Sequence, residues 1–387
     1  MIYYGKQSIN AADIQAVEEV LRSDFLTQGP AIERFERAVA DYCGVKYVVA
    51  VTNATSALHI ACLAADLGPG DILWTSPITF VASANCGRYC GATVDFVDID
   101  AKTYNMSVDA LEDKLRQAKK ENQPPKIVVP VHLAGQSCDM RRIRDLSEMY
   151  GFTVLEDASH GVGADYLGAK VGSCAFSDMA VFSFHPVKII TTGEGGMVLT
   201  NDKTLYERLI LYRSHGITRD PVKMTHEADG PWYYQQTALG FNYRMTDIQA
   251  ALGASQMTRL DEFVARRRAL AARYGELLKN LPLHTPYVLE GANPSWHIYI
   301  VRLALDQIGK TKQQIFEEMK ERGIMLNLHY IPVHRQPYYE KLGFRQGDFP
   351  ESEKYYEEAF TLPLYYELTN EEQEKVVETL KKVLRNR

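Results

Sequence analysis

An alternation of short apolar runs with amphipathic stretches, between about residue 30 and residue 200, constrains this chain more than any other feature. Several of the runs are apolar without interruption, as strands are when both faces of their sheet are covered. The predicted strands are KYVVAV (46–51), DILWT (71–75), TVDFV (93–97), KIVVPV (126–131), FTVLED (152–157), DMAVFSF (178–184) and GMVLT (196–200), with helices between them at 55–66, 79–90, 107–119 and 139–150. This order predicts an α/β fold in which a mostly parallel sheet lies between layers of helices.

The remainder of the chain is mainly helical. One helix is predicted in the first thirty residues, at 10–21, and residues 246–279 predict one long helix, straight or kinked. A short strand at 296–303 and helices at 311–322, 352–360 and 369–386 follow. We therefore predict a large domain over residues 1–250 and a smaller α+β domain over residues 251–387.

The composition of the chain limits what it can bind and where in the cell it is expected. The formal net charge of −6 and the pI of about 6.0 give the chain no overall attraction to nucleic acid or to anionic lipid. It contains no apolar run of about 18 residues, and its first residues lack the pattern of a secretion signal, so we expect a cytoplasmic protein without a membrane span. The six cysteines are expected to be reduced, and Cys86 and Cys90 to pack in the core rather than to bind metal.

The turn that follows the first predicted strand has the character of an anion site. In an open parallel sheet, ligands bind beyond the carboxyl ends of the strands. Thr52-Asn53-Ala54-Thr55-Ser56 lies at such an end and opens a helix, where free N–H groups and the helix dipole suit a phosphate. A plain N-terminal cap explains the same residues equally well.

Two ionisable residues follow other strands. Asp157 ends a buried strand, where a carboxylate is costly without a cationic partner, although it could also cap a following helix. Lys188 is flanked by Val187, Ile189 and Ile190, so desolvation should lower its pKa and make its amine nucleophilic, as a Schiff-base lysine requires.

Together the three loops indicate one ligand. The turn at 53–56 and Ser183 can take a phosphate, Lys188 an aldehyde, and Asp157 a protonated ring nitrogen. A phosphorylated aldehyde with a basic ring nitrogen is pyridoxal phosphate, whose enzymes use such a lysine and such an acidic partner. Phe80, after the second predicted strand, is the candidate to stack on the ring.

Several motifs resemble those of one family. They are LTQGP (26–30), TNATSAL (52–58), PITFVASAN (77–85), EDASHGVGA (156–164), SFHPVKIITTGEGG (183–196), RSHG (213–216) and GFNYRMTDIQAALG (240–253). In this order they resemble the DegT/DnrJ/EryC1/StrS sugar aminotransferases, from Tyr4 to beyond Tyr330. The resemblance implies a fold-type-I pyridoxal phosphate enzyme, with the cofactor in the large domain and residues 1–30 on the substrate side.

The resemblance also implies roles for single residues. Lys188 matches the family's catalytic lysine, Asp157 the partner of the ring nitrogen, and His160 a polar residue beside the ring and its 3-hydroxyl. The phosphate contacts match Ala54, Thr55, Ser56 and Ser183, and the stacking aromatic matches Phe80. Asn242 matches an asparagine that completes the phosphate site of the second subunit, which implies a homodimer with shared active sites. The substrate side implied by the family comprises Tyr4, Asp24, Phe25, Leu26, Thr27, Asn327, Leu328, His329 and Tyr330, with His185 and Arg213 as further candidates.

The implied reaction moves an amino group from L-glutamate to a keto sugar carried by a nucleotide diphosphate. Within the family, SFHPVKIITTGEGG and DASHGVGADYLGAKVG look most like the pseudaminic acid branch, which acts at C4 of a UDP-linked 4-keto-6-deoxy-N-acetylhexosamine. Another keto sugar, of the perosamine or 4-amino-4,6-dideoxyglucose type, is the nearest alternative. The family's dehydratases have a histidine in place of the lysine, so Lys188 argues against that activity. A DNA-binding regulator would need a basic face or a helix-turn-helix, and the sequence suggests neither.

Overall fold

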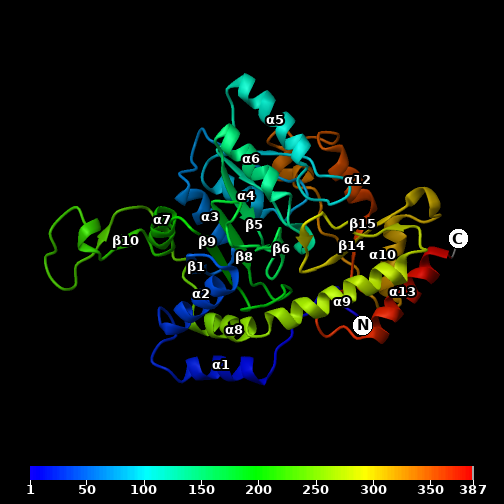
Figure 1. Cartoon of the computed structure of the whole chain (residues 1–387), viewed down its shortest axis with the longest axis horizontal. Helices are drawn as coiled ribbons and strands as arrows, with labels where there is room; N and C mark the ends of the chain where they lie inside the picture. The colour runs from blue at the N-terminus through cyan, green and yellow to red at the C-terminus, as the bar shows by residue number, and fades with distance from the viewer. Residues whose placement is uncertain (386–387) are drawn as a thin grey trace.

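The predicted strands form one seven-stranded sheet in the computed structural model, which describes residues 1–385 (Figure 1). Its order is β1-β9-β8-β5-β4-β2-β3, and within this described part of the chain β9 alone runs against the other strands of the sheet. The strands are β1 (Tyr47–Val51), β2 (Ile72–Thr75), β3 (Thr93–Phe96), β4 (Ile127–Val129), β5 (Thr153–Asp157), β8 (Met179–Ser183) and β9 (Gly196–Thr200). The α/β prediction with a mostly parallel sheet is confirmed.

Helices cover both faces of this sheet because successive side chains of each strand point to opposite sides. On β1, Val49 and Val51 join the core beneath α3 (Ala54–Ala64) and α4 (Ala82–Tyr89). Val48 and Ala50 join the opposite core beneath α2 (Pro30–Cys43) and α8 (Asp247–Met257). Helices α5 (Val108–Glu121) and α6 (Met140–Tyr150) cover Trp74, Val128 and Val154 of neighbouring strands.

A second, antiparallel sheet lies beside the first, with its own core. It has the order β12 (Leu283–His284), β14 (Tyr299–Leu303) and β15 (Ala359–Leu362). Its apolar side chains pack with α9 (Leu260–Leu278), α10 (Lys312–Glu321) and α13 (Asn370–Arg385). The division of the chain at residue 250 stays a prediction. The last residue of the helix predicted at 369–386 lies outside the described residues.

Several elements differ from the sequence-based prediction. The helix predicted at 246–279 is two helices, α8 and α9, because both the N–H and the hydroxyl of Thr258 donate to the Ser255 carbonyl and close the first helix there. Helices α2 and α7 (Lys203–Arg213) were not predicted, although Pro30 at the first position of α2 and the left-handed Gly44 after its end are ordinary boundary signals. The helix predicted at 352–360 is α12 (Pro350–Glu358), and residues 359–360 begin β15 instead.

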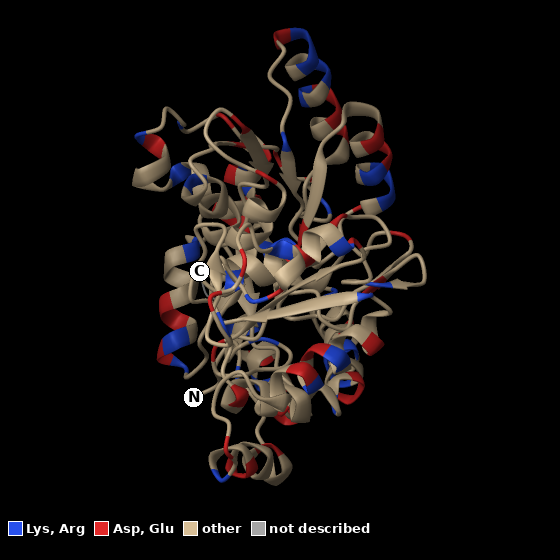
Figure 2. Ribbon diagram, turned by 90° about the vertical axis from the view of Figure 1, so that its left-hand side faces the viewer, with Lys and Arg blue, Asp and Glu red and all other residues tan. Residues whose placement is uncertain are grey.

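Shorter elements complete the chain. Helix α1 (Ala11–Leu21) confirms the helix predicted at 10–21 and packs on α8. The remaining short elements are β6 (Asp165–Tyr166), β7 (Ala169–Lys170), β13 (Ala292–Asn293) and α11 (Pro337–Glu340). Acidic and basic side chains are interspersed over the outer helices (Figure 2). Within residues 1–385, no helix combines the length and the apolar character that crossing a membrane requires.

A hairpin of residues 214–240, which we call the arm, projects from the body of the molecule after α7 (Figure 1). Its strands are β10 (Ile217–Thr218) and β11 (Gln235–Gln236). The arm leaves large apolar side chains in solvent: Trp232 is 72% exposed and Leu239 is 79% exposed. An isolated two-stranded hairpin has little stability of its own. Exposed apolar side chains of this kind are typical of surfaces that contact another molecule.

Candidate active site

A cavity of about 800 Å³ opens where the parallel strands end. The structure brings together there most of the residues that the sequence singled out. Those that line the cavity are Tyr4, Ala54, Thr55, Ser56, Phe80, Asp157, His160, Ser183, His185, Lys188, Asn327, Leu328, His329 and Tyr330. They come from the ends of β1, β2, β5 and β8 and the loops after them, from Tyr4 near the N-terminus and from the segment 327–330. A volume of this size suits a cofactor together with part of a substrate.

The start of α3 forms one wall of the cavity and presents hydrogen-bond donors that suit an anion. Asn53 is the N-cap, and its side-chain oxygen accepts from the N–H of Ser56 at 2.8 Å and from the Ser56 hydroxyl at 3.0 Å. The first intrahelical donor is the N–H of Ala57, so those of Ala54 and Thr55 remain for a ligand. The N-terminal cap considered from the sequence is therefore present, and phosphate binding at the same turn stays a prediction.

A glycine lets β9 pass against this turn. A Cβ added to Gly196 would lie 2.5 Å from the backbone N of Ala54, closer than real Cβ atoms come. The tight approach keeps the turn at 53–56 beside the ends of β8 and β9. Ser183, the last residue of β8, is buried and reaches the same cavity.

Asp157 ends β5 and is 6% exposed. Two neutral donors already contact its carboxylate: the Ser83 hydroxyl donates to one oxygen at 2.6 Å, and the Ser159 N–H donates to the other at 3.1 Å. A carboxylate can accept about four hydrogen bonds, so acceptor positions remain for a group in the cavity. No helix begins directly after β5, where the chain continues to β6, so Asp157 does not cap a helix.

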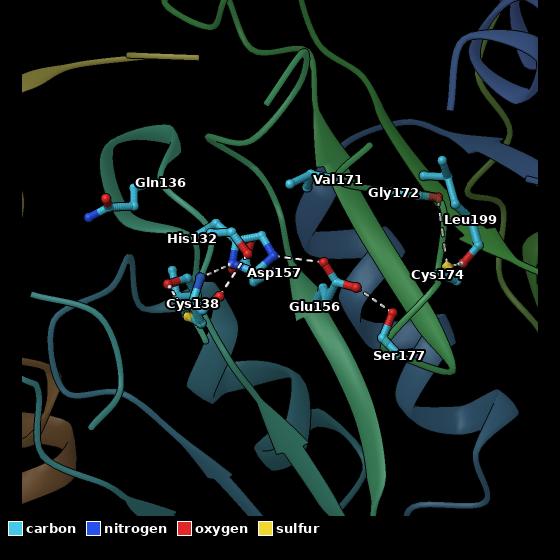
Figure 3. Close-up of polar contacts among 12 residues, drawn as sticks. His132, Gln136, Cys138, Glu156, Asp157, Val171, Gly172, Cys174, Ser177 and Leu199 are labelled. Carbon is cyan, nitrogen blue, oxygen red and sulfur yellow. Dashed lines mark hydrogen bonds and ion pairs between the residues drawn. The ribbon is translucent and has the colours of Figure 1, made fainter. Parts of the chain in front are cut away.

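The backbone of Asp157 is hydrogen-bonded to the segment that follows the neighbouring strand β4 (Figure 3). The His132 N–H donates to the Asp157 carbonyl at 3.1 Å. The Cys138 N–H occupies His132 Nδ1, which leaves Nε2 to carry the ring proton and to donate to Glu156 at 2.7 Å. Glu156 also accepts from the Ser177 hydroxyl. The loop after β4 is thus fastened to β5 just before the cavity.

Lys188 lies in the loop between β8 and β9. The loop is closed at its base, where the Phe184 N–H donates to the Gly195 carbonyl at 2.9 Å and the Thr192 N–H donates to the Phe184 carbonyl at 3.0 Å. Burial lowers the pKa of Lys188 to about 8, and the nearby negative charge of Asp157 raises it in part. The direction agrees with the prediction made from the apolar neighbours of this lysine.

Histidine rings next to Lys188 are held neutral. Burial, and then Lys188 and His329, keep the pKa of His160 well below its ordinary value, while burial and then Lys188 lower that of His329 to about 3. The Ala134 N–H donates to His160 Nδ1 at 3.3 Å, so the ring proton lies on Nε2 and points to the Tyr330 oxygen 3.0 Å away. The hydroxyl proton of Tyr330 is then left for a ligand.

Other predicted residues lie away from this cavity. Asp24, Phe25, Leu26 and Thr27 are exposed in the loop between α1 and α2, and Asn242 is exposed after the arm. Arg213 pairs with Glu36 at 2.9 Å and donates to the Ala50 carbonyl. The cofactor and substrate roles assigned to individual residues stay predictions.

Sequence reasoning missed several residues of the site. Thr79 and Ser83 lie in the motif PITFVASAN, Thr79 in the turn before α4 and Ser83 in its first turn, but only the tertiary fold brings Ser83 to Asp157. His297 lines the cavity and is 2% exposed, and its Nδ1 has no hydrogen-bond partner among the described residues. Its sequence neighbours, Trp296 and Ile298, gave no polar signal.

Comparison with known proteins identifies the family. The model of the DegT/DnrJ/EryC1/StrS aminotransferase family matches residues 7–381. The chain is 34% identical over 385 residues to the UDP-4-amino-4,6-dideoxy-N-acetyl-beta-L-altrosamine transaminase of Campylobacter jejuni, covering 99% of this chain and 98% of that protein. It is 38% identical over 359 residues to the GDP-perosamine synthase of Caulobacter vibrioides, covering 92% and 91%. Its fold matches that of Helicobacter pylori PseC, an aminotransferase involved in the biosynthesis of pseudoaminic acid, with a TM-score of 0.90, 31% identity and 99% coverage of both chains.

Enzymes of this family use pyridoxal phosphate, and the cavity fits that group. It offers unpaired N–H groups at the start of α3 for a phosphate, a carboxylate with free acceptor positions for a ring nitrogen, and an amine of lowered pKa for an aldehyde. The chain belongs to the DegT/DnrJ/EryC1/StrS aminotransferase family and is a pyridoxal-phosphate-dependent sugar aminotransferase.

Proposed function

We propose that this enzyme transfers the amino group of L-glutamate to C4 of UDP-2-acetamido-2,6-dideoxy-β-L-arabino-hex-4-ulose, a step of pseudaminic acid biosynthesis. The observation that carries this proposal is the full-length similarity, in sequence and in fold, to the Campylobacter transaminase and to PseC, together with the lysine and carboxylate that face one cavity. A GDP-linked perosamine precursor is a second candidate, favoured by the 38% identity to the Caulobacter synthase.

A substrate panel separates the two. UDP-, dTDP- and GDP-linked 4-keto-6-deoxy sugars are each incubated with the enzyme and L-glutamate, and the products are identified by NMR. We expect amination at C4 of the UDP-linked N-acetyl sugar with the highest kcat/KM. A higher kcat/KM for the GDP-linked sugar would overturn the pseudaminic acid assignment while leaving the transaminase chemistry in place.

The proposed catalytic roles follow from the geometry. When bound, the cofactor supplies an aldehyde that accepts amino groups and a cationic ring that withdraws electrons. Lys188, with its pKa of about 8, is partly a free amine near neutral pH. It can therefore take a proton from the α-carbon of glutamate in one half of the reaction and deliver a proton to C4 of the sugar in the other. Asp157 holds the ring nitrogen protonated, and the start of α3 with Ser183 orients the phosphate.

The lowered pKa of Lys188 leads to a pH prediction for the protein without cofactor. Only the free amine attacks an aldehyde, so the rate at which added pyridoxal phosphate is taken up should rise with pH through a midpoint near 8. The rise of visible absorbance after mixing measures it, with a small lysine derivative in the same buffers as the reference. Because Asp157 raises the pKa of Lys188, Asp157→Asn should move the midpoint to lower pH. A midpoint near 10 would contradict the desolvation of this amine.

We also propose a homodimer in which each active site uses Asn242 of the other subunit. Asn242 is exposed and does not line the cavity of its own chain. It follows the arm and forms a β-bridge with Ser214 at the base of the arm. The arm with its exposed Trp232 and Leu239 offers apolar surface for a second copy. Exposed loop 24–27 is proposed to contact substrate in this assembly.

Asn242→Ala should weaken retention of the cofactor about tenfold or more, since a hydrogen bond to a charged phosphate contributes roughly 1.5–3 kcal/mol. Equilibrium binding of pyridoxal phosphate to the purified variant measures this loss. Gln123→Ala, which removes an exposed amide after α5 and away from the arm, is the matched control and should bind normally.

Mixing Lys188→Ala with Asn242→Ala subunits tests whether the site is shared. In a mixed dimer with shared sites, one site carries both changes and the other carries neither. Activity should then rise on mixing when cofactor is limiting and subunit exchange is confirmed by mass spectrometry. No rise despite confirmed exchange would place both residues in one subunit's site.

A further inference from the structure

We propose that Thr79 and Ser83 form a directed relay of two hydroxyl groups that stabilises the negative charge of Asp157, and that they are thereby positioning residues for the reaction. The inference rests on the proposed function, in which Asp157 faces the ring nitrogen of the cofactor. It goes further by assigning a role to two side chains that are buried behind the carboxylate.

The geometry of the relay is tight and enclosed. The Ser83 hydroxyl lies 2.6 Å from a carboxylate oxygen of Asp157, and the Thr79 hydroxyl lies 2.6 Å from that of Ser83. Ser83 has no exposed surface, and Thr79 is 2% exposed. Water therefore cannot replace the Ser83 hydroxyl without a rearrangement, whereas Thr79 also borders the cavity.

The direction of the protons follows from a count of donors. Ser83 has a single hydroxyl proton and two acceptors near it, the Asp157 carboxylate at 2.6 Å and the Phe80 carbonyl at 3.3 Å. The shorter bond to the charged acceptor takes the proton. The contact between Thr79 and Ser83 then requires Thr79 to be the donor. Two aligned O–H dipoles thus point toward one carboxylate oxygen.

This arrangement has a consequence for a cation on the cavity side. A carboxylate whose charge is partly satisfied by Ser83 competes less for the proton of a ring nitrogen, so that proton stays on the ring and the ring stays cationic. Phe80 belongs to the same turn and is exposed in the cavity, where it is proposed to stack on the ring. One short segment, residues 79–83, therefore holds the ring nitrogen's partner and offers the stacking surface.

The test compares variants that remove or keep one hydroxyl. Ser83→Ala removes the donor to Asp157, Thr79→Val removes the second hydroxyl at nearly constant volume, and Thr79→Ser keeps it. Thr200→Val is the matched control, because Thr200 is fully buried and its hydroxyl donates to the Asp178 carbonyl at the end of β8 and β9 away from the cavity. Thermal unfolding of each variant reports the general effect of losing a buried hydroxyl.

The decisive readout is the pH at which the visible absorbance of the cofactor-loaded enzyme changes. When the ring is less cationic, it repels a proton on the neighbouring nitrogen less, so in Ser83→Ala this pH should rise by about half a unit or more. The kcat of Ser83→Ala should fall about tenfold, as expected for a lost hydrogen bond to a charged group. Thr79→Val should shift it in the same direction by less, Thr79→Ser should restore it, and Thr200→Val should leave it unchanged.

The outcomes distinguish this inference from the proposed function. If Asp157→Asn itself leaves the absorbance transition unchanged, the proposed role of Asp157 fails. If Asp157→Asn shifts the transition while Ser83→Ala and Thr79→Val do not, the relay is overturned and the role of Asp157 stands. A shift in Thr200→Val equal to that in Thr79→Val would also overturn the relay, because it would show a general effect of stability.

Discussion

Replacing Lys188 with alanine is expected to lower kcat by at least about 10⁴-fold, the upper range of contributions from one positioned acid–base group, because this amine also anchors the cofactor. The fold should persist, since the side chain lies at the wall of a cavity and forms no ion pair with another side chain of the described residues. The variant should still bind pyridoxal phosphate, through the start of α3 and Asp157. Formation of 2-oxoglutarate from glutamate measures turnover.

Two additional measurements make this prediction specific. Lys203→Ala, which changes an exposed lysine on α7, should retain full activity and controls for a general effect of removing a positive charge. Small primary amines added to the Lys188→Ala enzyme should restore part of the rate, because they can enter the cavity and carry the proton in place of the lysine. Turnover of Lys188→Ala near the wild-type rate would disprove the assignment.

Replacing Asp157 with asparagine should lower kcat by about 10²–10³-fold, the loss typical of removing one preorganised electrostatic group. The amide keeps the shape of the side chain and can still accept from Ser83, but it carries no charge to hold a protonated ring nitrogen. The visible absorbance of the loaded enzyme should shift as well. Steady-state kinetics and an absorbance spectrum of the same sample report both effects.

A control at the other end of the sheet separates charge from stability. Asp178 precedes β8, accepts from the Val154 N–H at 2.8 Å and pairs with Arg144, so Asp178→Asn removes a carboxylate without approaching the cavity. We expect this variant to lose stability but to keep its absorbance spectrum. A mild effect of Asp157→Asn, equal to that of Asp178→Asn, would mean that Asp157 acts only as a structural acceptor.

Much of the central sheet could be predicted because strands covered on both faces must be apolar along their whole length. KIVVPV and DMAVFSF show this pattern, and both became parallel inner strands, β4 and β8. Lys188 stood out for the same reason, since a cation among apolar neighbours is unusual. Helices α2 and α7 were not predicted because neither combines a capping side chain with an apolar stripe. The N-cap of α2, Gly29, has no side chain to cap with, and α7 buries Leu209 alone.

The parts of the site that could not be predicted depend on contacts between distant segments. No pattern around Asp157 pointed to Ser83, 74 residues away along the chain, whose hydroxyl the fold brings to the carboxylate. The unpaired nitrogen of His297 similarly becomes visible only when its neighbours in space are known. Whether loop 24–27 and Asn242 reach an active site depends on a second subunit, which no pattern within one chain places.

The closed base of the Lys188 loop determines which parts of the enzyme can move. Strands β8 and β9 pair along five residues, all of them buried, and the hydrogen bonds of Phe184 and Thr192 extend this pairing into the loop. Opening the loop would break the centre of the sheet, so amide exchange there belongs with global unfolding rather than with local fluctuation. We therefore expect this loop to stay closed when a bulky sugar nucleotide enters the cavity, with the reactive amine held in place.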